Sequence, residues 1–478
     1  MKKKWLVVLI ILLFLVAFIL RLVPIRMSHG WDETVYLQHA EIIFSDRDNF
    51  DEWAIRPPLI SIFIALGYFI YHSVVTASII TALLGALGVV FIFLVGKKLY
   101  NTNVGLIAAI ILALTPFIIK NSNLIMADVP VATLLTISFY LLLFHEKKWL
   151  MFFAGIFLGL SVLTKFPAVL IILVFIAYFY INRVKWNKIL LSILGFSIVM
   201  IPYFIWCYVK FGNFLEPFIT APKFAAVTNQ PFYFYLINLY TVFTIIIILG
   251  LVLWIMSIII KIRKKDYSEI NIDFILMFWI FILLIYLSNN PHKLLRYLMP
   301  IAPPLILLAS KGFDSTLSKI GKWARPILIL AIIVYLGFLV SSLQVIDYLQ
   351  KGEIVDYTKS DEVKISEYII NEMNYTGIVY ASHEWPIIAY YTGLNMTHIS
   401  YNEKVYEQIS VVMPKIGIIV GNYYHEVPPK KEVIYFNEKR PKVEHPTSKW
   451  MKNDTRFTFV KSIGSQYIFY YNPNATNN

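Results

Sequence analysis

The sequence predicts a polytopic α-helical membrane protein with a small α/β domain at its C-terminal end. Three observations support this fold class. First, 58% of the 478 residues are hydrophobic and 15% are charged, whereas soluble proteins contain about 25% charged residues. Second, apolar runs close to the length that a helix needs to cross a bilayer, about 20 residues, recur as far as residue 345. Third, no run after about Gln350 is long enough to span, and short helix and strand patterns take over.

The first apolar run, Trp5–Leu20, follows the sequence MKKK. No small-x-small cleavage site comes after it, so we interpret it as an uncleaved first helix with a cytoplasmic N-terminus. Ten further apolar runs bring the predicted number of spans to eleven. They cover residues 75–96, 104–119, 128–144, 149–164, 166–182, 188–209, 236–260, 273–288, 297–310 and 326–345.

The apolar run at residues 58–72 is treated differently. It is shorter than the ~17–25 residues of a usual span, and it begins at Pro57-Pro58. We interpret it as a juxtamembrane or re-entrant helix in the first outer loop. Every basic loop then lies in the cytoplasm, as the positive-inside rule requires, and the C-terminal domain lies outside. These loops are Lys97–Lys98, His145–Lys148, Arg183–Lys188, Lys261–Lys265 and Lys311–Arg325.

Composition excludes several other classes. The net charge of +13 is explained by the basic loops, so no nucleic-acid partner is expected. Cys207 is the single cysteine, and an intramolecular disulfide is therefore impossible. The sequence has no Walker loop, no GxGxxG after a strand, no CxxC and no HExxH, which leaves no case for an ATP-driven pump or a zinc enzyme.

We expect two domains, residues 1–345 in the membrane and residues 346–478 outside. In the second, KISEYIINEMN and EWPIIAYYTG have the patterns of helices, the latter with a glycine stop. Strands are predicted at GIVYAS, KIGIIVGN, EVIYF, RFTFV and QYIFYY.

A polar loop of mixed charge at residues 29–59 follows the first apolar run. Asp32 and Glu33 lie near its start, and the sequence ETVYLQHAEIIF that begins at Glu33 suits an amphipathic helix. Asp32 is either the N-cap of this helix or a general base that takes a proton from an acceptor hydroxyl. Its position just after the first helix, at the boundary of water and lipid, favours the base.

Arg56 closes the same loop in the sequence Arg56-Pro57-Pro58-Leu59. The prolines either simply begin a helix or stiffen the junction and fix the direction of Arg56. A guanidinium suits bidentate recognition of phosphate or carboxylate. Asp128, in IMADVPVA, either caps the next helix or pairs with an arginine or a sugar hydroxyl.

Further cations follow at the predicted outer boundary. Lys165 lies between two apolar runs and either extends to the interface or belongs to a functional site, because ionisable groups at membrane depth are costly. His292, Lys293 and Arg296 lie in NNPHKLLRYLMP. Arg296 follows Lys293 by three residues, so the two would share a helix face. Since Lys and Arg are disfavoured on the outer side, these groups suit a lipid-linked phosphate.

These motifs, in this order, resemble the membrane-embedded C-type (GT-C) glycosyltransferases that use polyprenyl-phosphate sugars. The most similar groups are the dolichyl-phosphate-mannose-protein mannosyltransferases and the bacterial enzymes that modify lipid A with aminoarabinose. The resemblance covers roughly residues 1–345. It rests on Asp32-Glu33 with Tyr36, on Arg56-Pro57-Pro58-Leu59, on Asp128 with Pro130, on Thr164-Lys165 and on Arg296-Tyr297.

The resemblance implies a GT-C fold with juxtamembrane helices in the first outer loop. It also implies inverting transfer of a sugar from a polyprenyl (dolichyl) phosphate donor to an acceptor hydroxyl outside the cell membrane. Asp32 matches the general base of the family and Glu33 its supporting acid. The acceptor would be a protein or a glycolipid, and neither a cofactor nor a divalent metal is expected. Substrate-binding residues would be Arg56, Asp128, Lys165, His292, Lys293, Arg296 and Tyr297.

Two other classes remain open from the sequence. A transporter or flippase of lipid-linked saccharides would usually contain repeats and polar groups near the midplane, whereas here the polar groups gather at one face and no repeat is visible. The other class is a structural assembly protein whose C-terminal domain performs the function.

Overall fold

A computed structural model describes residues 3–45, 53, 55–224, 230–265, 270–317, 324–381, 385–398, 413, 415–422, 424–426, 442–444 and 451–475. The chain forms two compact units. Unit 1 comprises Met1–Ile25 and Glu52–Val355, and unit 2 comprises Arg26–Asp51 and Asp356–Asn478. The predicted boundary at residue 345 differs from this division. The sequence analysis did not predict that the segment after the first helix, Arg26–Asp51, belongs to the same unit as the C-terminal domain.

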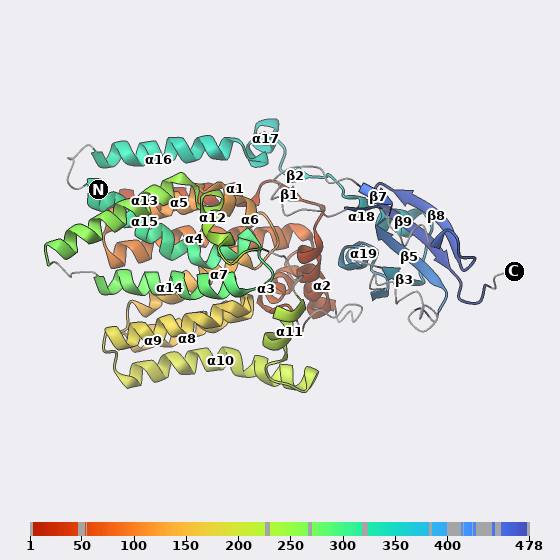
Figure 1. The fold of residues 1–478 in the computed structure, drawn as a ribbon, viewed down its shortest axis with the longest axis horizontal. Helices are drawn as coiled ribbons and strands as arrows, with labels where there is room; N and C mark the ends of the chain where they lie inside the picture. Colours follow the sequence, from red (N-terminus) through yellow and green to blue (C-terminus); the bar gives the residue numbers. More distant parts are fainter. Residues whose placement is uncertain are drawn as a thin grey trace. The chain divides into compact units, whose positions relative to one another are not determined.

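Unit 1 is helical, and its long helices lie lengthwise beside one another in Figure 1. The early elements are α1 (Lys3–Leu22), α3 (Leu59–Tyr68), α4 (Val74–Leu99), α5 (Thr102–Leu114), α6 (Pro116–Ser122), α7 (Asp128–Leu142), α8 (Lys148–Thr164), η1 (Phe166–Leu170) and α9 (Ile171–Ile181). The later ones are α10 (Trp186–Phe211), α11 (Glu216–Phe224), α12 (Phe234–Ile237), α13 (Leu239–Arg263), α14 (Ile270–Asn289), η2 (Leu295–Ile301), α15 (Ala302–Leu317), α16 (Ala324–Ser341) and α17 (Gln344–Lys351).

Among the described residues, five helices are long and apolar enough to cross a membrane, or up to seven if two bent pairs each count as one span. The bent pairs are α5 with α6, at 60°, and α16 with α17, at 79°. The protein is therefore a multi-pass membrane protein, while the count of eleven spans stays a prediction. Each predicted run is nevertheless occupied by a helix. The ten-residue α3, in the run at residues 58–72, is too short to span.

The bend between α5 and α6 has a local cause. Pro116 has no backbone N–H, so the carbonyl of Leu112, four residues earlier, loses its helical partner. The buried guanidinium of Arg21 on α1 replaces that partner, donating to Leu112 O at 2.8 Å and to Ala113 O at 3.1 Å. The broken helix is thus stabilised where water is absent.

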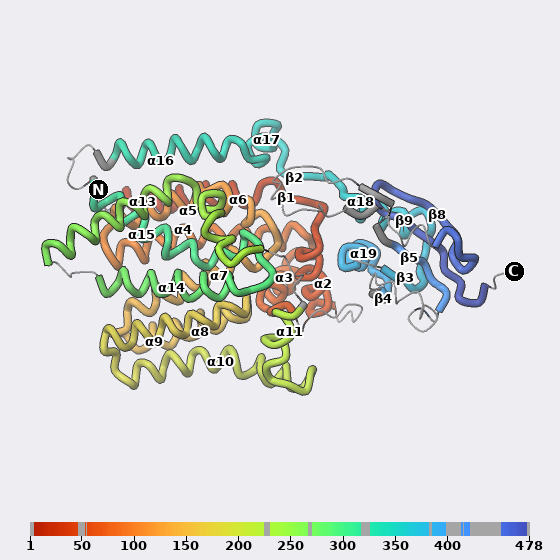
Figure 2. The backbone as a smooth tube through the Cα atoms, in the orientation of Figure 1, coloured from red at the N-terminus to blue at the C-terminus, as the bar shows by residue number. Residues whose placement is uncertain are grey.

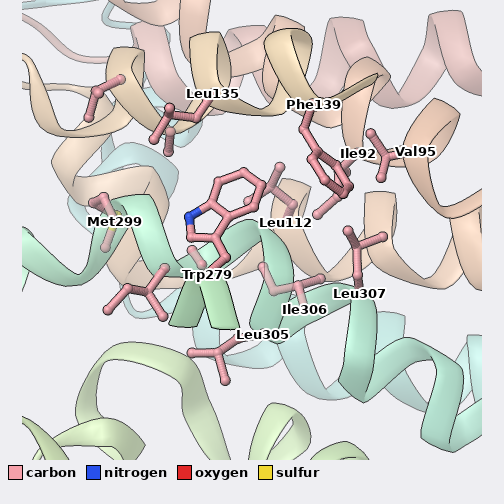
Figure 3. Packing of buried hydrophobic residues seen from close by; sticks show 14 of the residues in the cluster. Ile92, Val95, Leu112, Leu135, Phe139, Trp279, Met299, Leu305, Ile306 and Leu307 are labelled. Atoms are coloured by element: carbon pink, nitrogen blue, oxygen red, sulfur yellow. The ribbon is translucent and has the colours of Figure 1, made fainter. Parts of the chain in front are cut away.

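Trp279 of α14 lies at the centre of the largest hydrophobic cluster (Figure 3). Its indole is buried against Phe139 of α7, with ring centroids 5.5 Å apart, and its N–H donates to Pro300 O at 3.1 Å. Aromatic burial with a satisfied polar atom stabilises such a contact. The cluster therefore fixes α7, α14 and η2 relative to one another.

A buried ion pair lies within the last predicted cytoplasmic loop. Lys311 was predicted as the first residue of a cytoplasmic loop, but α15 continues to Leu317 and Lys311 is buried. Its ammonium donates to both carboxylate oxygens of Asp273 at 2.8 Å. Tyr100 and Trp254 donate to the same carboxylate at 2.6 and 3.1 Å. Because a buried charge is tolerated only when it is paired, this cluster joins α13, α14 and α15.

Unit 2 is built on a five-stranded sheet with the order β4-β3-β5-β9-β8. β3 is parallel to β4 and β5, whereas β9 is antiparallel to β5 and β8. Figure 2 traces these strands in blue. The bounds are β3 (Ile378–Ala381), β4 (Met396–His398), β5 (Gly417–Asn422), β8 (Phe457–Ile463) and β9 (Gln466–Tyr471), with a separate pair β6 (Tyr424–Glu426) and β7 (Lys442–Glu444). Another short pair joins β1 (Ile25–Arg26) to β2 (Val355–Asp356).

Both faces of the sheet are covered. Alternate strand residues point to opposite faces, so Val379 joins the cluster of Ile365 and Ile388 while Tyr380 joins Phe457. Ile365 and Ile388 belong to α18 (Asp361–Glu367) and α19 (Trp385–Thr392). α18 continues into the π-helical turn η3 (Tyr368–Glu372).

The predicted small α/β domain is confirmed. Both expected helices form, and Gly393, directly after the end of α19, has a φ of +66°, a conformation that favours glycine. The strands predicted from GIVYAS, KIGIIVGN, RFTFV and QYIFYY are β3, β5, β8 and β9. The strand predicted from EVIYF lies outside the described residues.

Candidate active site

Lys165 lies at a break between two helices of unit 1. α8 ends at Thr164, Lys165 has an extended backbone with φ −154° and ψ 119°, and η1 begins at Phe166. Pro167 in the first turn of η1 suits a helix start, because proline has no backbone N–H to donate. The break removes Lys165 from the regular helix and directs its ammonium to the carboxylate of Asp128.

Asp128 is the common partner of two cations. It lies in the first turn of α7 and its side chain is only 7% exposed. One oxygen accepts from Lys165, and the other is 3.7 Å from Nε of Arg296 in η2. The sequence left open whether Asp128 caps a helix or pairs with an arginine or a sugar hydroxyl. In the structure Asp128 pairs with Arg296. We call Asp128, Lys165, Arg296 and Tyr297 the Asp128 cluster.

The ring of Tyr297 completes this cluster. Lys165 Nζ lies 4.0 Å from its centroid and Arg296 Cζ lies 5.9 Å from it, both within cation–π range. Arg296 also places Nη1 3.1 Å from Met126 Sδ. Two cations face one carboxylate, so the cluster carries a formal charge of +1 and can attract an anion.

Arg56 and His292 adjoin the cluster. The positive charge of Arg56 acts on the Lys165 ammonium, and the His292 ring makes an edge contact with Tyr297 at 5.8 Å. The structure therefore brings together six of the seven predicted substrate-binding residues: Arg56, Asp128, Lys165, His292, Arg296 and Tyr297.

Lys293 is placed differently. The expected helix face shared with Arg296 does not form, because η2 begins only at Leu295. The Lys293 ammonium donates to the carbonyls of Asn290 at 2.8 Å and Gln230 at 3.2 Å. Lys293 thus joins two loops.

Tyr235 was not predicted. Burial raises the pKa of this phenol in α12, and the neighbouring Tyr297 and Asp128 contribute in the same direction. These contributions place Tyr235 beside the Asp128 cluster. The sequence around Tyr235 contains no motif that marks it as a site residue, because it is one of 31 tyrosines in an aromatic-rich chain.

The two predicted acids belong to unit 2. Both lie in the first turn of α2 (Trp31–Ser45), where carboxylates are stabilised by the helix dipole. Glu33 is buried and bonded to Arg26 through both oxygens, and its Oε2 accepts from Gly30 N at 3.0 Å. His29 Nδ1 lies 3.6 Å from Oε1.

These partners decide the ionisation of Glu33. Burial alone raises the pKa of its carboxyl, but the nearby His29 ring and the Arg26 guanidinium outweigh burial and lower the pKa to about 2. Glu33 therefore remains ionised at neutral pH and holds the segment before α2 in place. Arg26 and His29 were not among the predicted residues, although Glu33 follows His29 by only four positions.

Asp32 is half-buried beside Glu33, and the C-terminal part of unit 2 supports the helix that carries it. α19 packs against α2, where Val35 and Ala389 share a small cluster. Gln38 donates to Pro386 O at 2.6 Å. The Tyr391 hydroxyl donates to Met27 O and accepts from His29 N, both at 3.0 Å.

The apolar helices of unit 1 and the small sheet of unit 2 together define a class, the GT-C fold of membrane glycosyltransferases, as the comparison with solved structures shows. The crystal structure of ArnT from Cupriavidus metallidurans bound to undecaprenyl phosphate matches with a TM-score of 0.70 and 13% identity, and the match covers 99% of each chain. The oligosaccharyltransferase of Archaeoglobus fulgidus, tethered to an acceptor peptide, matches with a TM-score of 0.60 and 14% identity, over 88% of this chain and 69% of the other.

Two sequence matches extend the likeness. The family described as "Dolichyl-phosphate-mannose-protein mannosyltransferase" matches residues 55–206, which include Arg56, Asp128 and Lys165. An uncharacterized protein of Aquifex aeolicus (strain VF5) is 27% identical over 308 residues, and the match spans 59% of each chain. The resemblance to C-type glycosyltransferases predicted from the sequence is thereby confirmed.

Proposed function

We propose that the protein is an inverting glycosyltransferase that moves a sugar from a polyprenyl-phosphate donor to an acceptor hydroxyl on the outer face of the membrane. The Asp128 cluster carries this proposal. It gathers two cations and an aromatic ring around one buried carboxylate, and Arg56 adds a third positive charge nearby.

The cluster suits a phosphate that leaves as an anion. Fixed cations stabilise charge that develops in a transition state, and they do so most strongly where water is excluded. The phosphate of a lipid-linked sugar needs no general acid, because it is already a good leaving group. Arg296 and Lys165 bind this phosphate in our proposal, while Asp128 holds them in position. Undecaprenyl phosphate in the related ArnT structure and dolichol phosphate in a structure of the archaeal AglB support this class of donor.

Asp32 is the proposed general base. It takes the proton of the acceptor hydroxyl as that oxygen attacks the anomeric carbon, and the bond to phosphate breaks on the opposite side of the sugar. Glu33 is not the base in this proposal, because its carboxylate is bonded to Arg26 and Gly30. In this scheme Glu33 and the C-terminal domain orient α2, and no divalent metal takes part.

The test is transfer by the purified full-length protein in liposomes. A panel of undecaprenyl- and dolichyl-phosphate sugars is supplied together with glycolipid and protein acceptors, and release of the lipid phosphate is measured. Asp32→Asn should lower kcat by about 100-fold or more, in the range of general-base catalysis, while donor binding changes less than about twofold. Asp347→Asn, at an exposed carboxylate in α17, is the matched control.

Two results would overturn the proposal at different points. Release of lipid phosphate from no donor in the panel would reject the glycosyltransferase function. Release by wild type that persists in Asp32→Asn would reject only the base.

A further inference from the structure

α10 packs mainly on α8 and not on α9, which precedes it in the sequence. Gly155 of α8 and Gly195 of α10 bring the two backbones into contact. A Cβ at Gly155 would lie 1.9 Å from Ser192 O, and one at Gly195 would lie 2.0 Å from Phe152 O. Small residues permit such close helix packing in membranes. α9 packs on α14 instead, and the space between α9 and α10 is left open.

A cavity of about 1050 Å³ occupies this space, at the upper end of the ~300–1,000 Å³ typical of ligand sites. Its walls are mostly apolar. α9 contributes Ile172, Phe175, Ile176, Phe179 and Tyr180, and α8 and α10 contribute Leu158, Ile189, Ile193 and Phe196. We call it the α9–α10 groove. In Figure 1 its helices are drawn in yellow shades.

One end of the α9–α10 groove is basic and aromatic. Arg183 lines it together with Trp186, and Lys185 lies exposed between them in the chain. The side chains of Tyr180 and Trp186 are 85% and 75% exposed. Tryptophan and tyrosine prefer the membrane–water interface, so this end lies at the depth of lipid head groups.

We propose that the α9–α10 groove binds an anionic glycerophospholipid, with its acyl chains along α9 and α10 and its phosphate at Arg183 and Lys185. Apolar walls accept hydrocarbon, and basic pockets between membrane helices on the cytoplasmic side bind anionic head groups. This site does not depend on the proposed glycosyltransferase function.

The site is separate from the proposed donor phosphate site. Lys165 directly precedes η1, and Arg183 follows the end of α9 by two residues. The sixteen residues of η1 and α9 between them extend roughly 25 Å at the helical rise of about 1.5 Å per residue. One phosphate cannot reach both cations, so the lipid at Arg183 is a different molecule from the donor.

Native mass spectrometry of the full-length protein tests the proposal, with palmitoyl-oleoyl phosphatidylglycerol and the matching phosphatidylcholine as probes. Wild type should retain one phosphatidylglycerol at least fivefold more tightly than phosphatidylcholine. Arg183→Ala with Lys185→Ala should reduce this preference to less than twofold. The control removes two exposed cations elsewhere, Lys264 and Lys265, by substitution with alanine and should keep the preference.

A second pair of variants tests the groove itself. Ile176→Trp places an indole in the cavity and should abolish the tight lipid. Leu190→Trp adds the same group at an exposed position outside the cavity lining and should retain it. Equal retention of both lipids by wild type, or an unchanged Ile176→Trp, would overturn the proposal. Displacement of phosphatidylglycerol by undecaprenyl phosphate would assign the groove to the donor chain instead.

Discussion

Asp32 and Glu33 are adjacent in sequence but have different surroundings. Successive residues of a helix project about 100° apart, so Glu33 points to Arg26 and the backbone of Gly30, while Asp32 remains half-buried on another side. A buried carboxylate with strong partners is held ionised. Such a group stabilises the fold and makes a poor proton acceptor.

Glu33→Gln tests the structural role. The pKa of Glu33 is lowered from 4.5 to about 2, which corresponds to roughly 3 kcal/mol. A depressed carboxyl pKa stabilises the folded state above the unfolded pKa, and this contribution is lost as pH falls from about 4.5 to about 2. Thermal unfolding in detergent should therefore show a lower Tm for Glu33→Gln at pH 7. The loss of stability between pH 4.5 and 2 should be smaller in the variant than in wild type.

The control for Glu33→Gln is Glu372→Gln. This carboxylate is 65% exposed and lies 3.6 Å from Lys461, and exposed ion pairs contribute about 0–1 kcal/mol. The Tm of the Glu372→Gln variant should stay close to that of wild type. Equal melting profiles of the Glu33 variant and wild type from pH 7 to pH 2 would show that Glu33 does not hold α2.

Arg296→Ala tests the phosphate site. Loss of a charge-assisted contact of about 1.5–3 kcal/mol should raise the donor KM by about tenfold to 100-fold. Lys210→Ala removes an exposed cation that stacks on Trp206 and Phe211 and should leave KM within twofold. Donor titration of the reconstituted variants measures both effects. An unchanged KM in Arg296→Ala would remove the basis for a phosphate site in the Asp128 cluster.

Most residues of the Asp128 cluster could be identified from the sequence, because charged groups are unfavourable near apolar runs. A charged side chain at the end of an apolar run costs free energy at membrane depth. For this reason the sequence analysis selected Lys165, Asp128 and Arg296. The same reasoning failed for Lys293, because a loop conformation and not a helix decides its direction. Tyr235 was missed because its neighbours Tyr297 and Asp128 are distant in sequence.

The helix α2 is stabilised by an element about 350 residues later. α19 contributes Pro386 O as an acceptor for Gln38 and the Tyr391 hydroxyl as a link between Met27 and His29. Burial raises the pKa of Tyr391 to about 12, so this hydroxyl keeps its proton at neutral pH. The C-terminal domain thereby fixes the segment that precedes Asp32.

Tyr391→Phe tests this link. Each hydrogen bond contributes about 1 kcal/mol, so the loss of both should lower kcat by about fivefold to 30-fold, since Asp32 is oriented less well. The donor KM should change less than twofold. Tyr375→Phe removes a comparable bond, to Ile378 O at 3.0 Å, away from α2 and should leave kcat unchanged. Equal losses of kcat in both variants would indicate a general loss of stability.

The periodicity of apolar residues predicted the helices and strands better than it predicted which elements pack together. The apolar runs and the short patterns of the C-terminal domain specified helices and strands because those signals are local. The pairing of α2 with α19 joins segments far apart in sequence, and no local pattern encodes it. The breaks at Lys165 and after α5 have local causes in Pro167 and Pro116, but the partners of the polar groups there, Asp128 and Arg21, belong to other helices.

The orientation of the whole chain rests on its basic loops. Lys97 and Lys98 lie in the last turn of α4, and Lys264 and Lys265 follow α13. The positive-inside rule predicts that all four lie in the cytoplasm. α4 has 26 residues, or roughly 39 Å at about 1.5 Å per residue, which exceeds the hydrocarbon core. We therefore predict that the residues before and after α4 lie on opposite sides of the membrane.

Single cysteines introduced into a Cys207→Ser background test this orientation in intact cells. Cys207 is buried and is the only native cysteine, so its replacement leaves a clean background. A membrane-impermeant maleimide should label Tyr71→Cys and Asn474→Cys, both exposed positions. Lys98→Cys and Lys264→Cys should react only after the cells are permeabilised. The reverse pattern would place the Asp128 cluster on the cytoplasmic side. A glycosyltransferase with that orientation would then act on acceptors inside the cell, which contradicts the proposed function.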